Sequence, residues 1–489
     1  MTQAVSTSGS VHVSVKNFAA LFGEAIHPIA IDTYQRPYVW DTDKVDQLIT
    51  DLDEYCSKTS PSGTSLDYYM GAVLLHEDIK EQKLFIIDGQ QRFTSLCLLH
   101  HALTGALPDN QALSYRSPLS VANIKQAQSR FEQCGLRQHA ANLFGRICFT
   151  VITVPSEDLA FTFFDTQNNR GMPLQATDLL KAYHLRAING DGLQTDCAER
   201  WERLQGSKQI LGCGPDFAPT LFHQFLWRAR RWRGQKVIAR ESYDDIIAEF
   251  QDGAISIRSE APDTVPLYAS RSNQLGSAII LLPQEGYKLE SQSIHLSNDP
   301  AELPFAIRQP ISRGVGFFLY ADKYTALTQH LLGDEHPNSE VLAFREFYNQ
   351  VIADLSLYLR ELFLLASVMY IDQFSHHQLL HFALWLDHVL GAIRIKKQYI
   401  FKEAPLIFLR DSPHNLLDVI ASAFRPQEVI AHLKKDPEAN SIYDTESIKT
   451  GEGVQGRYKQ RVLQYYGKEG SLKGKADWIA NKFKEKLPA

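Results

Sequence analysis

The sequence predicts an α+β protein, in which an N-terminal α/β domain is followed by a mainly α-helical C-terminal region. Up to about residue 190, short apolar runs rich in β-branched residues alternate with stretches whose apolar residues have helical spacing. The sequence Gly190-Asp191-Gly192 interrupts this order and predicts a domain boundary. Beyond it most periodic stretches are helical, and the strongest of them covers residues 339–397.

These patterns divide the chain into four predicted parts. Residues 1–12 are mostly small and polar and predict a flexible N-terminus, and residues 13–192 form the α/β domain. Residues 193–450 form the mainly helical domain, and residues 451–489, rich in Gly and Lys, form a basic C-terminal cap or tail.

Periodicity predicts the elements of the α/β domain in turn. They are a strand or short helix over 14–21, a helix over 43–55, a pair of strands over 69–76 and 83–87, a helix opened by Arg92, a helix over 121–143, a strand over 146–154 and a helix over 177–188. In the helical region we expect helices over 201–209, 220–232 and 243–250, short strands over 278–282 and 293–296, and a helical core over 339–397 with breaks near 372–375.

Composition limits the classes of protein that this chain can belong to. With 489 residues, 44% of them hydrophobic and 22% charged, it is an ordinary globular chain and not a mostly disordered one. The formal net charge of -6 means that any contact with DNA must come from a local basic patch.

Cysteine usage and hydropathy point to a cytoplasmic protein without a membrane partner. The six cysteines include no Cys-x-x-Cys pair, which predicts reduced thiols and no zinc ribbon. The longest uncharged apolar stretch, residues 362–371, is about half of the roughly 20 residues that a membrane span needs. Residues 1–10 lack the charged start and apolar stretch of a signal peptide.

The most informative motif is Asp88-Gly89-Gln90-Gln91-Arg92, between a predicted strand and a predicted helix. Helix N-termini present unpaired N–H groups, and an arginine can chelate an oxyanion, so this junction is suited to phosphate. We expect Arg92 to bind phosphate, Gln90 and Gln91 to bind phosphate, ribose or base, and Asp88 to hold a metal ion, a water or an orienting bond. The alternative makes Asp88 a helix cap with Arg92 as its surface partner.

A second motif, Ile31-Asp32-Thr33-Tyr34-Gln35-Arg36-Pro37-Tyr38-Val39-Trp40, precedes the first. It offers a second guanidinium from Arg36, an amide from Gln35 and the ring of Tyr34 for a ligand. Tyr38 and Trp40 could stack on a base, but we expect core packing for both. A buried Arg36 needs an anionic partner, either a protein carboxylate or a ligand phosphate.

A third motif, Asn168-Asn169-Arg170-Gly171, lies in a predicted loop ahead of a helix. Asn168 and Arg170 are candidate ligand contacts. Asp178 stands three residues after Gln175, at the capping-box position, so a structural role is expected for it. Lys181, one turn later, either reaches the ligand that Asn168 and Arg170 would contact or points to solvent.

These three motifs together resemble the N-terminal domain of the GmrSD-type restriction enzymes, a ParB-like (ParB/sulfiredoxin) family. The hallmarks are Tyr-Gln-Arg-x-x-x-Trp, Asp-Gly-Gln-Gln-Arg, and Asn-x-x-Gly followed here by Leu174, Asp178 and Lys181. The resemblance covers roughly the first 190 residues. It implies a ParB-like fold that binds and hydrolyses a nucleoside triphosphate with Mg²⁺, within a restriction or phage-defence system.

The residues expected to act in this way fall into two sets. The catalytic set, in which Asp88 also holds the metal, is Asp88, Gln90, Gln91 and Arg92. The nucleotide-binding set is Tyr34, Gln35, Arg36, Asn168, Arg170 and Lys181.

A basic segment in the helical region is a candidate contact for DNA. Arginines lie among aromatic residues from Trp227 to Arg233, with no acid from 228 to 240, a pattern that suits phosphate backbones. The predicted contacts are Arg228, Arg230, Arg231 and Arg233. The alternative is a solvated helix face that neutralises acids elsewhere.

Three functions remain open from the sequence. Family members that cut DNA with an HNH-type domain carry a His-x-x-Pro segment near the C-terminus, and this chain has none there. We therefore expect a partner nuclease or methyltransferase beside a nucleotide-hydrolysing component. The alternatives are a ParB-like DNA nickase that acts by itself and a non-catalytic nucleotide-sensing adaptor.

Overall fold

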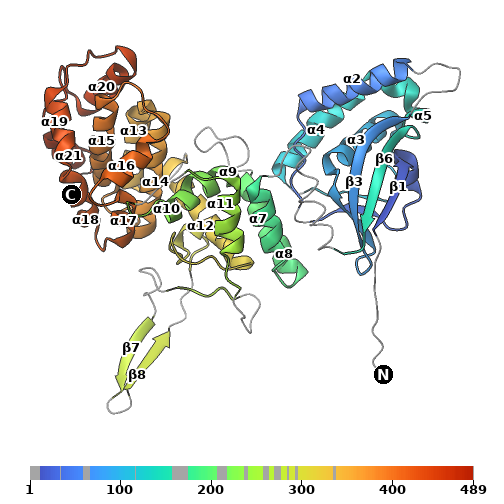
Figure 1. Cartoon of the computed structure of the whole chain (residues 1–489), viewed down its shortest axis with the longest axis horizontal. Helices are drawn as coiled ribbons and strands as arrows, with labels where there is room; N and C mark the ends of the chain where they lie inside the picture. Colours follow the sequence, from blue (N-terminus) through green and yellow to red (C-terminus); the bar gives the residue numbers. More distant parts are fainter. Residues whose placement is uncertain are drawn as a thin grey trace. The chain divides into compact units, whose positions relative to one another are not determined.

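The computed structural model describes most of the chain in two compact units (Figure 1). The described residues are 11–32, 35–58, 67–115, 117–156, 175–205, 217–235, 240–256, 264–268, 277–282, 286–291, 296–333 and 338–487. The first unit is Met1–Leu185 with Asn189–Gly206, and the second is Arg186–Ile188 with Ser207–Ala489.

A mixed sheet of six strands in the order β1-β6-β3-β4-β2-β5 forms the centre of the first unit, among the described residues. Strand β3 pairs antiparallel with β4 and parallel with β6, and β2 is parallel to β4. The strands are β1 (His12–Asn17), β2 (Ile29–Ile31), β3 (Tyr68–Asp78), β4 (Lys83–Asp88), β5 (Gln111–Ala112) and β6 (Ile147–Val154). The β-branched alternation of β6 suits this pleated, half-buried surface.

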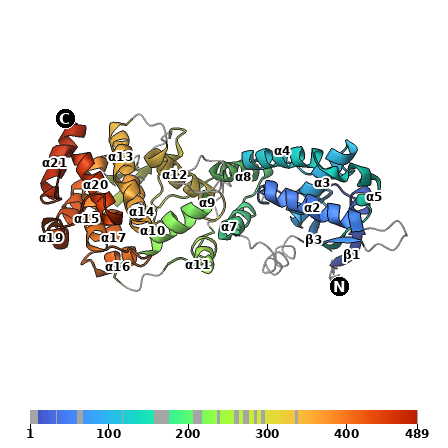
Figure 2. The same ribbon diagram turned by 90° about the horizontal axis from the view of Figure 1, so that it is seen from above.

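Helices pack on one face of the sheet and close the core there. The strand residues Val73, Ile86 and Phe149 share one hydrophobic cluster with Phe93 and Leu96 of α3. Helices α2, α3 and α4 gather on this face in both views (Figures 1 and 2). The helices of the first unit are α1 (Phe18–Gly23), α2 (Thr42–Lys58), α3 (Gln90–Thr104), α4 (Pro118–Glu132), η1 (Gly135–His139), α5 (Ala140–Leu143), α7 (Ala176–Leu185) and α8 (Asp191–Gln205).

The second unit is mainly helical. Helices α14 and α15 are buried along most of their length, because they are apolar on nearly every side, and they form its core. The first half of its elements comprises α9 (Ala218–Thr220), η3 (Leu221–Trp227), α10 (Arg228–Arg231), α11 (Tyr243–Ile247), η4 (Ala248–Asp252), β7 (Ser277–Leu282), β8 (Gly286–Ser291), η6 (Pro300–Glu302), α12 (Val315–Leu332) and α13 (Ser339–Gln350). The second half comprises η7 (Ile352–Asp354), α14 (Leu357–Phe374), α15 (Leu379–Lys396), α16 (Ala404–Asp411), α17 (Leu416–Ser422), α18 (Pro426–Lys434), α19 (Pro437–Thr445), α20 (Gly453–Tyr466) and α21 (Lys475–Lys486).

The C-terminal segment, predicted as a cap or a tail, forms helices α20 and α21 within the second unit. Lys475, at the start of α21, is fully buried and pairs with Asp387 of α15 at 2.7 Å. Its ammonium group also donates to the hydroxyl groups of Tyr443, at 3.0 Å, and Tyr458, at 3.2 Å. Separating α21 from α15 would leave the charge of Asp387 or Lys475 buried without its partner, which is costly, so this pair holds the two helices together.

The predicted α+β class is confirmed, and most predicted elements are present. The paired strands over 69–76 and 83–87 are β3 and β4, and the break near 372–375 is the end of α14. Strands β2 and β5 were missed because they are too short to show periodicity. The partner of β7 is β8 at Gly286–Ser291, and the strand expected over 293–296 falls mostly outside the described residues. Within the described part of the chain, no helix is long and apolar enough to cross a bilayer.

Candidate functional site

The junction between β4 and α3 is built on a glycine in the left-handed region. Gly89 has φ 104°, and its carbonyl accepts the first helical N–H, that of Phe93, at 2.9 Å. No side chain caps this helix end; the carboxylate of Asp88 pairs instead with Arg92 at 3.1 Å. The predicted alternative of Asp88 as a cap therefore does not hold, whereas its pairing with Arg92 does.

Glutamine side chains join the two principal motifs. Gln35 donates its amide hydrogen to the carbonyl oxygen of Ile87 at 3.1 Å, just before the junction. Gln91 uses both ends of its amide: Nε2 donates to Pro37 O at 2.9 Å, and Oε1 accepts from Val39 N at 2.8 Å. Because both of its polar atoms are hydrogen-bonded to the first motif and its side chain is buried, Gln91 holds that motif in position.

Gln90 differs from Gln91 because one of its polar atoms is open. Its Nε2 donates to Arg36 O at 2.7 Å and to the hydroxyl of Tyr115 at 3.2 Å, which fixes the orientation of the amide. Its Oε1 is buried and has no hydrogen-bond partner in the described part of the chain. An unpaired buried acceptor is costly, so this atom is suited to a donor from a water or a ligand hydroxyl.

Arg92 rests in a recess of β3 at Gly71. Its Nη1 donates to Met70 O at 3.0 Å, and a Cβ on Gly71, where φ is +105°, would lie 2.6 Å from that nitrogen. The pairing of β3 with β6 shifts register between Tyr69 and Ala72, so a bulge forms this recess. The side chains of Arg92 and Asp88 remain 23% and 37% exposed, which leaves both open to a ligand.

Helix α7 contributes a buried cation to the first motif. The ammonium group of Lys181 donates to Gln35 O at 3.1 Å and lies 3.9 Å from Glu202, so it does not pair with solvent. Asp178 accepts from the N–H of Gln175 at 3.1 Å, which confirms its expected capping role. Burial raises the pKa of Asp178, against the lowering effects of that N–H and of the charges of Arg36 and Lys181.

Two aromatic residues of the first motif, Tyr38 and Trp40, pack in the core. Tyr38 is fully buried, its hydroxyl bonds Ser95 Oγ at 2.8 Å, and burial raises its pKa to about 12. Trp40 is half-buried against the same cluster, so core packing is confirmed for both. Tyr115 was missed, because nothing near it in the sequence marks it as a partner of Gln90.

The structure brings together Gln35, Arg36, the 88–92 motif and Lys181. Tyr34, Asn168 and Arg170 lie outside the described residues. Arg92 is paired with Asp88, and the charge of Arg36 acts on Asp178, so each guanidinium has an internal carboxylate near it. An incoming phosphate must therefore compete with these acids.

The predicted DNA-contacting arginines divide into two internal and two outer residues. Arg228 is buried and bonds Glu241, at 2.6 Å, and Glu361, at 2.7 Å. Arg230 pairs with Glu249 at 2.5 Å and donates to the carbonyl of Ile307 at 2.9 Å. This geometry does not fit a DNA contact for Arg228 or Arg230, because their donors are used inside the domain.

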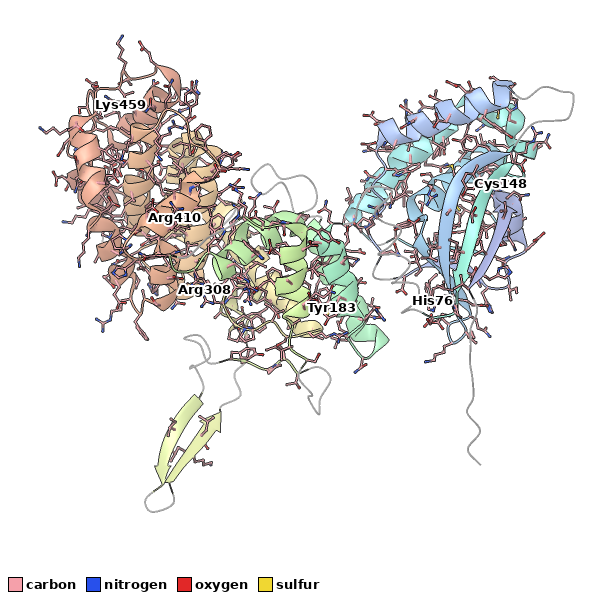
Figure 3. All side chains as sticks on the ribbon, in the orientation of Figure 1. His76, Cys148, Tyr183, Arg308, Arg410 and Lys459 are labelled. Carbon is pink, nitrogen blue, oxygen red and sulfur yellow. The ribbon has the colours of Figure 1, made fainter. Side chains whose placement is uncertain are left out.

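The two outer residues, Arg231 and Arg233, have N–H donors that are accessible to solvent. Arg231 also pairs with Glu249, and its side chain is half exposed, whereas Arg233 is exposed. Of the predicted set, these two remain candidates for a DNA contact. Arg308, labelled in Figure 3, lies beside this segment and donates to Ala229 O at 2.8 Å.

Comparison with known families finds two matches along the chain. Residues 193–450, more than half of the chain, match the model of a family of unknown function (DUF7834). The chain belongs to the DUF7834 family. Residues 18–185 match the model for the GmrSD restriction endonuclease, N-terminal domain, so the first unit carries a GmrSD-type N-terminal domain. None of the curated proteins is similar enough in sequence to count as a match.

The predicted Mg²⁺ contact in the GmrSD-type domain depends on Asp88 alone. Among the residues that the structure describes, no three His, Cys, Asp or Glu side chains form a metal site. Mg²⁺ commonly binds through one or two carboxylates together with substrate phosphates and water, so a single exposed carboxylate beside a phosphate site fits the ion. The Asp88 side chain is 37% exposed, so its carboxylate is accessible to such an ion.

Proposed function

We propose that this DUF7834 chain is a nucleotide-binding component of a DNA restriction or phage-defence system. Its GmrSD-type domain would bind and hydrolyse a nucleoside triphosphate with Mg²⁺, and a partner nuclease would cleave the DNA. The observation that carries the proposal is the joining of two distant motifs by Gln35, Gln90 and Gln91. These bonds hold the backbone of Arg36 beside the N-terminus of α3, where Asp88 and Arg92 remain open.

Each residue of this site would then have a distinct role. Arg92 and Arg36 would exchange their internal carboxylates for phosphoryl oxygens and stabilise the charge that develops on them. Lys181 holds the first motif through Gln35 O and adds positive charge below it. Gln90 would use its Oε1, which accepts no hydrogen bond from a described residue, to orient the attacking water, while Gln91 positions the motif.

Asp88 would hold the metal ion. When bound, Mg²⁺ would neutralise charge on the phosphates. Asp88 and Arg92 share one hydrogen bond at 3.1 Å, so occupation of Asp88 by a cation would release Arg92 for the nucleotide. This coupling implies that nucleotide binding depends on the presence of the cation.

The helical DUF7834 region would recognise DNA or the partner protein. We place the protein in the cytoplasm, since the described cysteines Cys56, Cys97, Cys134, Cys148 and Cys197 are all free thiols. A reducing compartment suits such a chain.

The decisive experiment is phosphate release by the full chain, measured with each common nucleoside triphosphate in the presence and absence of Mg²⁺. Arg92→Ala should lower the rate by about 100-fold or more, as expected for the loss of a donor that stabilises the transition state. Arg130→Ala is the matched control, because it removes another partly exposed arginine–aspartate pair, with Asp46, from the same domain. Equal rates for the two variants, with unchanged folding, would contradict the proposed site.

The same experiment separates the two alternative functions. Nicking of a supercoiled plasmid without nucleotide, lost in Asp88→Asn, would support the ParB-like nickase. Nucleotide binding in equilibrium dialysis without phosphate release would support the sensing adaptor.

A further inference from the structure

The loop between α15 and α16, residues 397–403, exposes two aromatic rings to solvent. Tyr399 is 69% exposed and Phe401 is 70% exposed. Large aromatic side chains gain stability by burial, so two neighbouring exposed rings on one loop indicate a binding surface more than a packing surface. The loop leads into α16, whose Arg410 is labelled in Figure 3.

Two arginines hold the backbone of this loop in place. Arg394, in the last turn of α15, is buried and donates to Gln398 O at 2.5 Å and also to Lys397 O. At the other end, Arg240 donates to Lys402 O at 3.2 Å. The rings are therefore presented on a braced backbone, which lowers the entropy that a ligand would lose by ordering them.

Neither arginine forms an ion pair with a carboxylate of the described residues. Within the described residues, the partners of Arg394 are loop carbonyls, and those of Arg240 are the carbonyl of Lys402 and the ring of Tyr358, whose centroid is 5.1 Å away. Burial alone lowers the pKa of Arg394. The negative end of the α15 dipole offsets only about half a charge.

The remaining charges around the loop leave it positive. Lys402 is 3.8 Å from Glu403, and the α15 residue Lys396 is paired with Glu438. No carboxylate lies within ion-pair distance of Lys397 among the described residues; the nearby Asp411 is paired with Arg410 at 2.8 Å. The loop thus combines cations that lack a carboxylate partner with solvent-exposed aromatic rings. Arg228 and Arg230, in contrast, form ion pairs with glutamates inside the domain.

We infer that the α15–α16 loop is a binding site for single-stranded nucleic acid, in which bases stack on Tyr399 and Phe401, the exposed Lys397 contacts a phosphate, and Arg240 and Arg394 add positive charge beneath the loop. Every base has a face for stacking, and interspersed cations match the backbone between bases. A lipid surface fits less well, because membrane binding grows with buried apolar area and two rings offer little of it.

The test is fluorescence anisotropy of the full chain with a labelled oligo(dT) of about 20 nucleotides, long enough to span one such site. The double variant Tyr399→Ala/Phe401→Ala should weaken binding by about tenfold or more for each ring. Lys397→Gln should lower the slope of binding against salt by about 0.7. Phe424→Ala is the control, since it removes a ring that is 78% exposed on a different loop, and its binding should be unchanged.

Several results would overturn the inference. They are no binding by the native chain, equal loss in the Phe424→Ala control, and duplex of the same length bound as tightly as oligo(dT). Sedimentation with phosphatidylserine vesicles that is lost in the double variant would instead identify a membrane site. Phosphate release by the GmrSD-type domain should be unchanged in the loop variants, so failure of this inference is separable from failure of the proposed function.

Discussion

The recess that holds Arg92 leads to a sharp prediction for Gly71→Ala. The added methyl group would lie 2.6 Å from Arg92 Nη1, closer than any ordinary contact, on a backbone whose φ is +105°. Arg92 would have to leave, and its hydrogen bond to Met70 O, now 3.0 Å, would break. We therefore expect two costs, one from the backbone and one from the displaced guanidinium.

The two costs can be separated with a matched glycine. Gly190 has φ +106°, and a Cβ there meets nothing within 4 Å, so Gly190→Ala carries the backbone cost alone. That cost is about 1–2 kcal/mol. Losing a hydrogen bond from a charged donor adds about 1.5–3 kcal/mol, so Gly71→Ala should cost about 2.5–5 kcal/mol in total.

Thermal unfolding of the full chain, followed for the GmrSD-type domain, measures the difference. For a domain of this size each kcal/mol shifts Tm by about 2–4 °C, so Gly71→Ala should melt about 3–12 °C below Gly190→Ala. The double variant Gly71→Ala/Arg92→Ala completes a thermodynamic cycle. If Gly71→Ala costs the same with and without Arg92, the recess does not act on the guanidinium and the reasoning is refuted.

Other predictions follow from the contacts of single side chains. Gln91→Ala breaks two buried hydrogen bonds to the first motif and should lower stability by about 2–4 kcal/mol, whereas the exposed Gln126→Ala should change it little; equal Tm values would contradict this. Arg228→Ala leaves two largely buried glutamates unpaired and should cost about 3–5 kcal/mol in chemical unfolding, while Arg233→Ala should be nearly neutral; a similar cost for both would argue against the Arg228 pairing. Burial, with a smaller effect of a nearby lysine, lowers the pKa of His388 from 6.5 to about 3, so the stability it provides is complete above pH 6.5 and is lost as the pH falls toward 3. At pH 5 the loss should be about 2 kcal/mol, and His388→Gln should remove that part of the acid sensitivity in a comparison of Tm at pH 7 and pH 5.

The sequence predicted the location of the candidate site better than the roles within it. The apolar run before Asp88 and the helical spacing after Arg92 placed the motif at a strand–helix junction, and the structure has it there. Local periodicity is enough for such a prediction, since neighbouring residues determine it. The same holds for the capping role of Asp178, which depends on a spacing of three residues.

Long-range partners could not be predicted in this way. Gln91 reads as a ligand contact from the sequence because its partners, Pro37 and Val39, lie more than fifty residues away along the chain. The same is true of Arg228, whose partner Glu361 belongs to another helix. Nor does the sequence show that a bulge at Gly71 makes room for Arg92, because only the sheet register brings the two together.

Whether a cation already has a carboxylate partner distinguishes the candidate binding sites for polyanions from the internal ion pairs of this chain; the number of cations does not. Arg228 and Arg230 have glutamate partners inside the DUF7834 region, and DNA would have to break those pairs to reach them. Arg92 also has a carboxylate partner, but that pair is partly exposed, so exchange for a phosphate costs little desolvation. At the α15–α16 loop the described arginines bond to carbonyls, which cancel no net charge, so a phosphate backbone would meet an uncompensated field without displacing any acid. Nucleotide binding at the proposed site should therefore depend on the cation at Asp88, whereas nucleic-acid binding at the loop should depend mainly on salt concentration.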